Sequence, residues 1–159
     1  MARHQWSGLN KMQVGAYAEY FVKMELTMFG FQVYSTEVDD RGVDFVARRE
    51  AGRFIEIQVK SLRRNGYVFM QKSKFPIRED RYLALVLFAE GEAPRLFLIP
   101  SAVWLAPNAM FVSRDYKAEG QISEPEWGIN LSKKNMPRLA PYEFDAAIAE
   151  FGIAVGRAQ

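Results

Sequence analysis

The sequence contains no cysteine and a single histidine, His4. The absence of cysteine excludes disulfide frameworks and cysteine-based zinc sites. One histidine near the N-terminus is too few for a histidine triad or a histidine metal cluster. No apolar run is long enough to span a bilayer, and residues 1–11 lack the apolar segment of a signal peptide. We therefore expect a soluble, cytoplasmic protein with no membrane partner.

The remaining composition is that of a globular protein. Of the 159 residues, 49% are hydrophobic, 14% aromatic and 25% charged, so the chain can bury a core of ordinary size. The formal charge of +2 is too small to indicate nucleic acid by itself. No repeat or low-complexity linker divides the chain. We expect one domain over 1–159, with a core over about 11–99 and a C-terminal elaboration over 100–159.

The first expected element is a helix over 11–29. Apolar residues recur there at helical spacing, and Gly15 falls on the same stripe as Val22. Asn10 is placed to cap the helix, and Gly30 is placed to end it.

A run of expected strands follows the helix. Alternating apolar and polar residues predict strands over 31–38, 43–49 and 53–61, joined by short turns as an antiparallel meander. The apolar run 82–88 is typical of a strand buried on both faces. We also expect short helices over 71–77 and 101–105, strands over 67–70, 95–99, 110–113 and 128–131, and a final amphipathic helix over 141–151.

Polar side chains gather on the strand expected over 53–61. Because successive side chains of a strand point to opposite faces, Glu56, Gln58 and Lys60 share one face. Asp44 lies near the start of the neighbouring strand. A carboxylate, a carboxamide and an amine on adjacent strands form a candidate site.

These residue types suit a divalent cation and a phosphodiester. Hydrolysis needs charge neutralised on the phosphate and a nucleophilic water, and Mg²⁺ or Mn²⁺ supplies both through oxygen ligands. Neighbouring strands lie about 4.8 Å apart, so Asp44 and Gln58 can reach one ion. The backbone carbonyl of Val59 can serve as a further ligand. Lys60, one step along the same face, can position the attacking water or stabilise the developing charge.

Each residue also has a purely structural interpretation. Asp44, just after Gly42, can cap a turn. Lys60 can be an ordinary strand-end lysine, Gln58 an ordinary residue on a polar face, and Glu19 a partly exposed residue at the edge of the helix stripe. Four separate explanations are then needed, and their co-location favours a site.

The order of these residues resembles the PD-(D/E)xK nuclease superfamily. The resemblance covers 11–88 and is carried by Glu19, Gly42-Val43-Asp44 and Gln58-Val59-Lys60-Ser61. At Gln58-x-Lys60 the sequence is similar to a branch of bacterial proteins in which Gln replaces the usual Glu. It is more distantly similar to archaeal Holliday-junction resolvases.

The resemblance implies an α/β restriction-endonuclease-like fold. That fold has an αβββαβ core and a mixed central sheet flanked by helices, here with extra C-terminal strands and a helix. Glu19 would add a second carboxylate to the ion site. Gln58 is neutral, so the ion would have one anionic ligand fewer than with a glutamate there. Glu19 or Glu56 could supply the missing negative charge. For Glu56 we favour a structural role. Nucleases of this fold are often dimers, so a homodimer also fits the resemblance.

Basic residues follow the site strand and suggest contacts with nucleic acid, DNA in the first place. The first cluster contains Arg63, Arg64, Lys72, Lys74, Arg78 and Arg81, interleaved with Tyr67 and Phe69, and the second contains Lys133, Lys134 and Arg138. Such side chains would neutralise phosphates. The alternative is a solvated basic surface.

We expect from the sequence a divalent-metal-dependent nuclease acting on DNA or RNA. Two alternatives remain open. One is a non-catalytic nuclease-like domain that binds nucleic acid. The other is a protein-interaction or immunity module on the same fold, with the segment 123–132 and an exposed Trp127 as its contact surface.

Overall fold

A computed structural model describes residues 2–38 and 41–152 of the chain. The turn expected at Asp39 and Asp40 lies outside the described residues. The elements are α1 (Lys11–Met28), β1 (Phe31–Ser35), β2 (Phe45–Arg49), β3 (Ile55–Leu62), β4 (Gly66–Gln71), β5 (Arg81–Leu87), β6 (Arg95–Pro100), β7 (Phe111–Arg114), β8 (Glu126–Leu131) and α2 (Phe144–Ile148). Short 3₁₀ helices cover Trp6–Gly8, Ser101–Leu105, Met136–Tyr142 and Ala149–Phe151.

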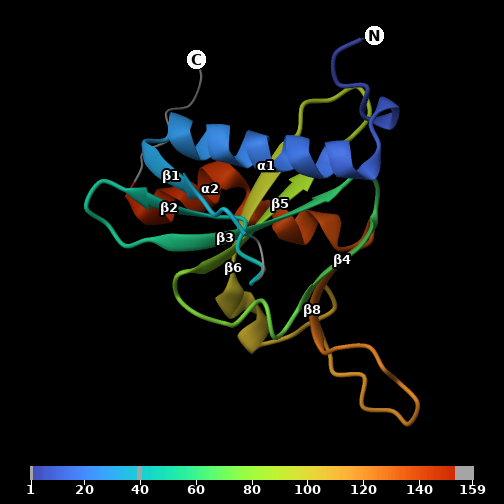
Figure 1. Ribbon diagram of the computed structural model, residues 1–159. Helices are drawn as coiled ribbons and strands as arrows, with labels where there is room; N and C mark the ends of the chain where they lie inside the picture. The colour runs from blue at the N-terminus through green and yellow to red at the C-terminus, as the bar shows by residue number, and fades with distance from the viewer. Residues whose placement is uncertain (1, 39–40, 153–159) are drawn as a thin grey trace.

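The central sheet is mixed and has the strand order β1-β2-β3-β5-β6. The first three strands form the expected antiparallel meander, β3 and β5 run parallel, and β6 returns antiparallel to β5. A second, antiparallel sheet has the order β4-β8-β7. Figure 1 shows α1 lying across the central sheet, with β4 and β8 below it.

Helix α1 forms where the sequence predicts it. The Asn10 side chain accepts a hydrogen bond from the Gln13 amide, and the Gln13 side chain accepts one from the Asn10 amide, which makes a capping box. Gly30 follows the helix with a φ of +83°. The buried stripe consists of Val14, Ala18, Val22 and Leu26. Gly15 is exposed, so its expected place in the apolar stripe is wrong.

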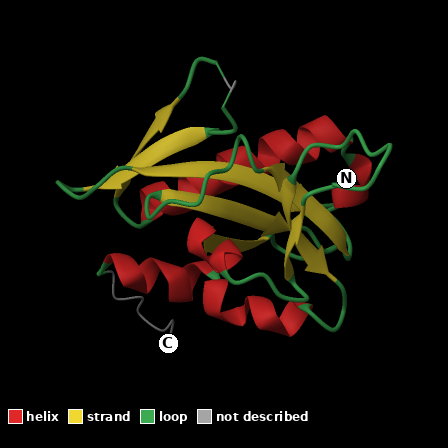
Figure 2. Cartoon of the chain, turned by 90° about the horizontal axis from the view of Figure 1, so that it is seen from below, coloured by secondary structure: helices red, strands yellow, loops and turns green. Residues whose placement is uncertain are grey.

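The two faces of the central sheet bury separate cores. Strand β5 alternates between them, because Tyr82, Ala84 and Val86 join the core under α1, whereas Leu83 and Leu85 join the core under the second sheet. Residues of α2 belong to the same core as α1. Helices flank the strands in the view of Figure 2.

Three expected elements differ from the structure. The segment 71–77 forms a tight turn and no helix: the amides of Lys74 and Phe75 both donate to the Gln71 carbonyl, and the Phe75 ring is fully buried. The strand expected over 31–38 ends at Ser35. The final helix is shorter than expected, since regular α-helix is confined to Phe144–Ile148.

Candidate functional site

Asp44 is fixed against β3 on both sides of Gln58. Its N–H donates to the Ile57 carbonyl at 2.9 Å, and its carboxylate Oδ2 accepts from the Val59 N–H at 2.5 Å. The loop before β2 therefore places a carboxylate beside the strand position that carries Gln58.

The carbonyl of Val59 lies on the same edge of β3 as Asp44. In an extended strand the N–H and the C=O of one residue point toward the same neighbour. Because the Val59 N–H reaches Asp44, its carbonyl faces the same side. A backbone oxygen and a carboxylate therefore share the opening where β2 begins.

Gln58 holds an unsatisfied oxygen. Its Oε1 is buried and has no hydrogen-bond partner among the described residues. Such an acceptor costs about 1–3 kcal/mol when left unpaired. Gly42 packs close by: it has a φ of +68°, and a Cβ there would lie 3.0 Å from the Lys74 carbonyl oxygen and 3.4 Å from Gln58 Nε2. The glycine thus allows the loop to close over the Gln58 amide.

Lys60 stands between two hollows of the surface. The smaller one is also lined by Gln58, Phe69 and Lys74 and has a volume of about 210 Å³. The larger one, of about 770 Å³, lies toward the first turns of α1. Lys60 is half-buried, so its amine can serve a group bound in either hollow.

Glu19 lies at the seam between α1 and the sheet. Its carboxylate forms an ion pair with Lys23 at 2.7 Å, and the Lys23 amine also donates to Ser35 Oγ at 3.1 Å. The same amine lies 5.3 Å from the centre of the Phe45 ring, and Phe45 directly follows Asp44. The structure thus places Glu19 on the helix face that meets the start of β2.

Lys23 is a site neighbour that sequence reasoning missed. Its side chain is only 19% exposed, and it contacts Glu19 as well as β1 and β2. The i,i+4 spacing from Glu19 could have indicated the pair. The contacts with the strands could not be read from local sequence.

Glu56 has a structural environment, as we expected. Its carboxylate pairs with Arg81 at 3.0 Å and with Arg78 at 2.9 Å. Arg81 is 1% exposed and also donates to the carbonyls of Gly42 and Lys74. Burial lowers the pKa of Arg81, and the Glu56 charge opposes that shift. The network ties the loop before β2 to β3 and β5.

Two arginines of the expected nucleic-acid cluster pair with carboxylates of the protein itself. Arg81 is buried, so that expectation is wrong for it. Arg78 pairs with Asp80 as well as Glu56, and hydrogen bonds to these two carboxylates raise the pKa of Arg78. The same contact with Arg78 lowers the pKa of the Asp80 carboxyl.

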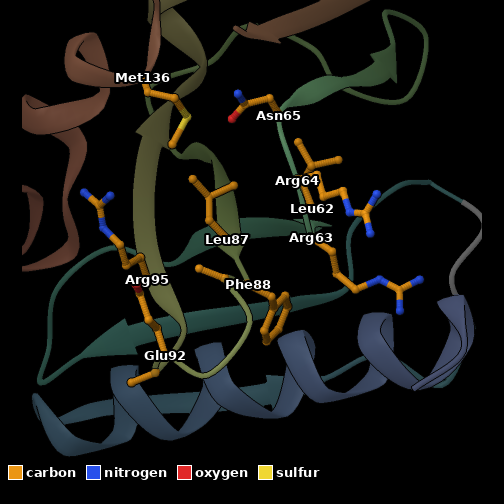
Figure 3. Close-up of a pocket in the computed structure, with 11 residues that line it drawn as sticks. Leu62, Arg63, Arg64, Asn65, Leu87, Phe88, Glu92, Arg95 and Met136 are labelled. Atoms are coloured by element: carbon orange, nitrogen blue, oxygen red, sulfur yellow. The ribbon is translucent and has the colours of Figure 1, made fainter. Parts of the chain in front are cut away.

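The other basic residues fall at opposite ends of the second sheet. Strands β4 and β8 pair so that Gly66 lies opposite Leu131, which brings the loop of Arg63 and Arg64 close to the turn after β8. That turn carries Lys133 and Lys134, both exposed. Figure 3 shows Arg63 and Arg64 extending away from the apolar wall formed by Leu87 and Met136. Arg138 is exposed on the 3₁₀ helix that follows the turn.

The remaining two lie at the far end of β4. Lys72 pairs with Asp115 at 2.7 Å and lies 4.0 Å from the centre of the Trp127 ring. Lys74 is exposed and lines the small hollow beside Gln58. The expected exposure of Trp127 is wrong, because its ring packs on the core under the second sheet and its Nε1 donates to the Phe75 carbonyl.

The aromatic pair of β4 is divided between two environments. Tyr67 donates to the buried carboxylate of Glu126 at 2.8 Å, and it lies across Gly128, where a Cβ would come within 1.9 Å of the Tyr67 hydroxyl oxygen. Burial and the Glu126 contact raise the pKa of Tyr67. Phe69 is 48% exposed and borders the hollow of Gln58 and Lys60.

The donor set suits a hard cation more than a transition metal. The described residues contain no group of three or more His, Cys, Asp or Glu side chains that could hold a metal. The carboxylate of Asp44, the unpaired oxygen of Gln58 and the Val59 carbonyl are all oxygen donors, as Mg²⁺ prefers. The orphaned Gln58 oxygen is the observation that fits a cation.

The architecture is found in two solved nucleases. No protein-family model and no curated protein sequence matches the chain. The Holliday junction resolvase Hjc of Archaeoglobus fulgidus superposes with a TM-score of 0.53 at 14% identity, over 89% of this chain and 98% of that one. The bacterial homing endonuclease I-Ssp6803I does so with a TM-score of 0.52 at 16% identity, over 89% and 91%.

No helix in the described part of the chain is long and apolar enough to cross a membrane. Both solved neighbours are restriction-endonuclease-like nucleases. The mixed central sheet with few helices, matched over most of this chain, shows that the protein has a restriction-endonuclease-like fold.

Proposed function

We propose that the protein is a divalent-metal-dependent nuclease that hydrolyses phosphodiester bonds in DNA or RNA. The observation that carries the proposal is the buried Gln58 Oε1, which has no partner among the described residues, on the strand position next to the Val59 amide that holds the Asp44 carboxylate. A cation at this place would satisfy that oxygen. The nuclease identity of both solved neighbours supports the same reading.

Three oxygen donors would hold the ion, and Glu19 would contribute a fourth. Asp44 supplies the nearest negative charge, while Gln58 and the Val59 carbonyl supply neutral oxygens. When bound, Mg²⁺ or Mn²⁺ would neutralise charge on the scissile phosphate and lower the pKa of a water. Glu19 would have to break its ion pair with Lys23 before it could bind the ion. We therefore regard it as the weakest of the four donors.

Lys60 would act on the phosphate and the water. Its amine is a compact, mobile point charge with three donors. From its position between the two hollows, it would hold the attacking water or stabilise charge that develops on the phosphate oxygens.

The test is a cleavage assay on branched, duplex and single-stranded DNA and on RNA, with Mg²⁺ or Mn²⁺ and with EDTA. We expect cleavage that EDTA abolishes. Asp44→Asn keeps an acceptor for the Val59 amide but removes the charge, and Lys60→Met removes the amine. Each should lower the rate by at least about 100-fold, the usual scale for loss of one preorganised electrostatic group.

Asp145→Asn is the matched control, because Asp145 is an exposed carboxylate on α2. It should cleave at the parental rate. If the parent binds nucleic acid but cleaves none of these substrates with either metal, the protein is a binding domain and the proposal fails.

A further inference from the structure

Gly15 has no structural reason to be a glycine. It lies in the second turn of α1, where glycine is among the least favourable residues. Apart from its chain neighbours and the backbone of its own helix, a Cβ built on it would meet no atom of the described residues within 4 Å. Its φ is not in the left-handed region. Gly42 and Gly128, in contrast, are required by close contacts within the protein.

Gly15 lines the larger groove beside Lys60. The groove, of about 770 Å³, is formed by Lys11, Val14 and Gly15 of α1, by the end of β3 with the residues that follow it, and by Trp6 and Ser7. Lys11, Gly15 and Glu19 are spaced by four residues and therefore share one helix face. The groove wall thus runs from the helix N-terminus past Gly15 toward the proposed site.

The groove is positively charged. Among the described residues that line it, the cationic side chains are those of Lys11, Lys60, Arg63 and Arg64, and the one carboxylate is that of Glu90. Glu90 is held by hydrogen bonds from the Ser7 amide and hydroxyl, each at 2.9 Å. The excess of cations suits a polyanion.

Two of these cations differ in how they are held. Arg63 donates to the carbonyls of Leu9 at 2.7 Å and Trp6 at 3.2 Å, which fixes its guanidinium at the rim. Arg64 is exposed and has no ion pair with any described residue. Arg64 is therefore available to a phosphate group.

We propose that a nucleic-acid strand runs along this groove, with its sugar–phosphate backbone against the helix backbone at Gly15. The absence of a side chain permits that close approach. Lys11 and Arg64 bind phosphates on the way, and the strand reaches Lys60. The inference rests on the proposed nuclease function only in that the groove leads to Lys60 of the proposed catalytic site.

The test separates binding from cleavage. Affinity for fluorescein-labelled single-stranded and branched DNA, and for RNA of the same sequence, is measured by anisotropy in EDTA, and thermal unfolding is measured alongside. Gly15→Ala should raise the melting temperature, because alanine favours the helix, and should weaken binding by about tenfold, roughly one polar contact. Gly15→Leu should weaken it further.

Ala16→Leu is the matched control, because Ala16 is exposed on the same helix and does not line the groove. It should bind as the parent does. Parental affinity in both Gly15 variants, or a parent that binds none of the probes, overturns the inference. If the parent binds but never cleaves, and the Gly15 variants bind more weakly, the proposed nucleic-acid groove stands. The proposed nuclease function is then the one that fails.

Discussion

Glu56 and Gln58 lie two residues apart on one face of one strand, yet their surroundings are opposite. Glu56 pairs with two arginines, one of which is completely buried. Gln58, although neutral, has a buried oxygen without a partner in the described part of the chain. The charged residue is the satisfied one, and the uncharged residue is the one left incomplete.

This difference divides the polar face of β3 into two halves. Toward the start of the strand, the Glu56 network connects β3, β5 and the loop before β2, and it contributes to the fold. Toward its end, Gln58 and Lys60 border open hollows. Polar residues on a strand face therefore cannot be assigned to one role by their spacing, since the role depends on what each side chain meets.

The largest change in stability is expected from removing the ion pairs of Glu56. Glu56→Ala would leave the buried Arg81 charge without its carboxylate, which typically costs about 3–5 kcal/mol. Urea unfolding measures the loss. Glu79→Ala is the control, because Glu79 is 91% exposed and its pair with Arg53 is on the surface; that change should have little effect. Equal stability of both variants would show that the network does not stabilise the fold.

Replacing Gln58 should change the stability in the opposite direction. Gln58→Leu replaces an unpaired buried acceptor by apolar atoms, so we expect the metal-free protein to gain about 1 kcal/mol of stability while losing cleavage. Gln58→Glu should instead lower the concentration of Mg²⁺ needed for half-maximal activity. A loss of stability in Gln58→Leu would mean that the Gln58 amide serves the fold, as Glu56 does.

The smallest effect concerns a carboxylate near another carboxylate. Burial, and then the charge of Asp145, raise the pKa of Glu25. A raised folded-state pKa means that stability is lost as pH rises from the unfolded pKa through the folded one. Glu25→Gln should therefore be slightly more stable than the parent at pH 7 and equal to it near pH 3, as measured by thermal unfolding. An equal difference at both pH values would contradict an electrostatic origin.

The sequence predicts well those parts that depend on local pattern. The alternation of β3 and the capping of α1 by Asn10 are visible in a few consecutive residues, and both are confirmed. The motif residues Asp44 and Gln58 could also be selected, because the order of helix, meander and buried strand restricts where they stand.

What sequence reasoning missed depends on contacts distant in the chain. Arg81 looked like one of several surface cations, but its partners lie at Gly42, Glu56 and Lys74. The second sheet joins β4 to β8, which is far away in the sequence, and this pairing places the partly buried Trp127 against the core under that sheet. Gly15 fits an apolar stripe by periodicity, and only its position on the helix surface shows that it faces the groove.

The contact of Arg63 with the segment before α1 also has a consequence for dynamics. Its hydrogen bonds to the Trp6 and Leu9 carbonyls connect that segment to the residues just after β3. We therefore expect the segment before α1 to detach only when the Arg63 guanidinium breaks these hydrogen bonds. Amide hydrogens exchange slowly where opening requires the loss of packing and hydrogen bonds, so we expect slow exchange to extend ahead of α1, into the segment that forms one wall of the groove.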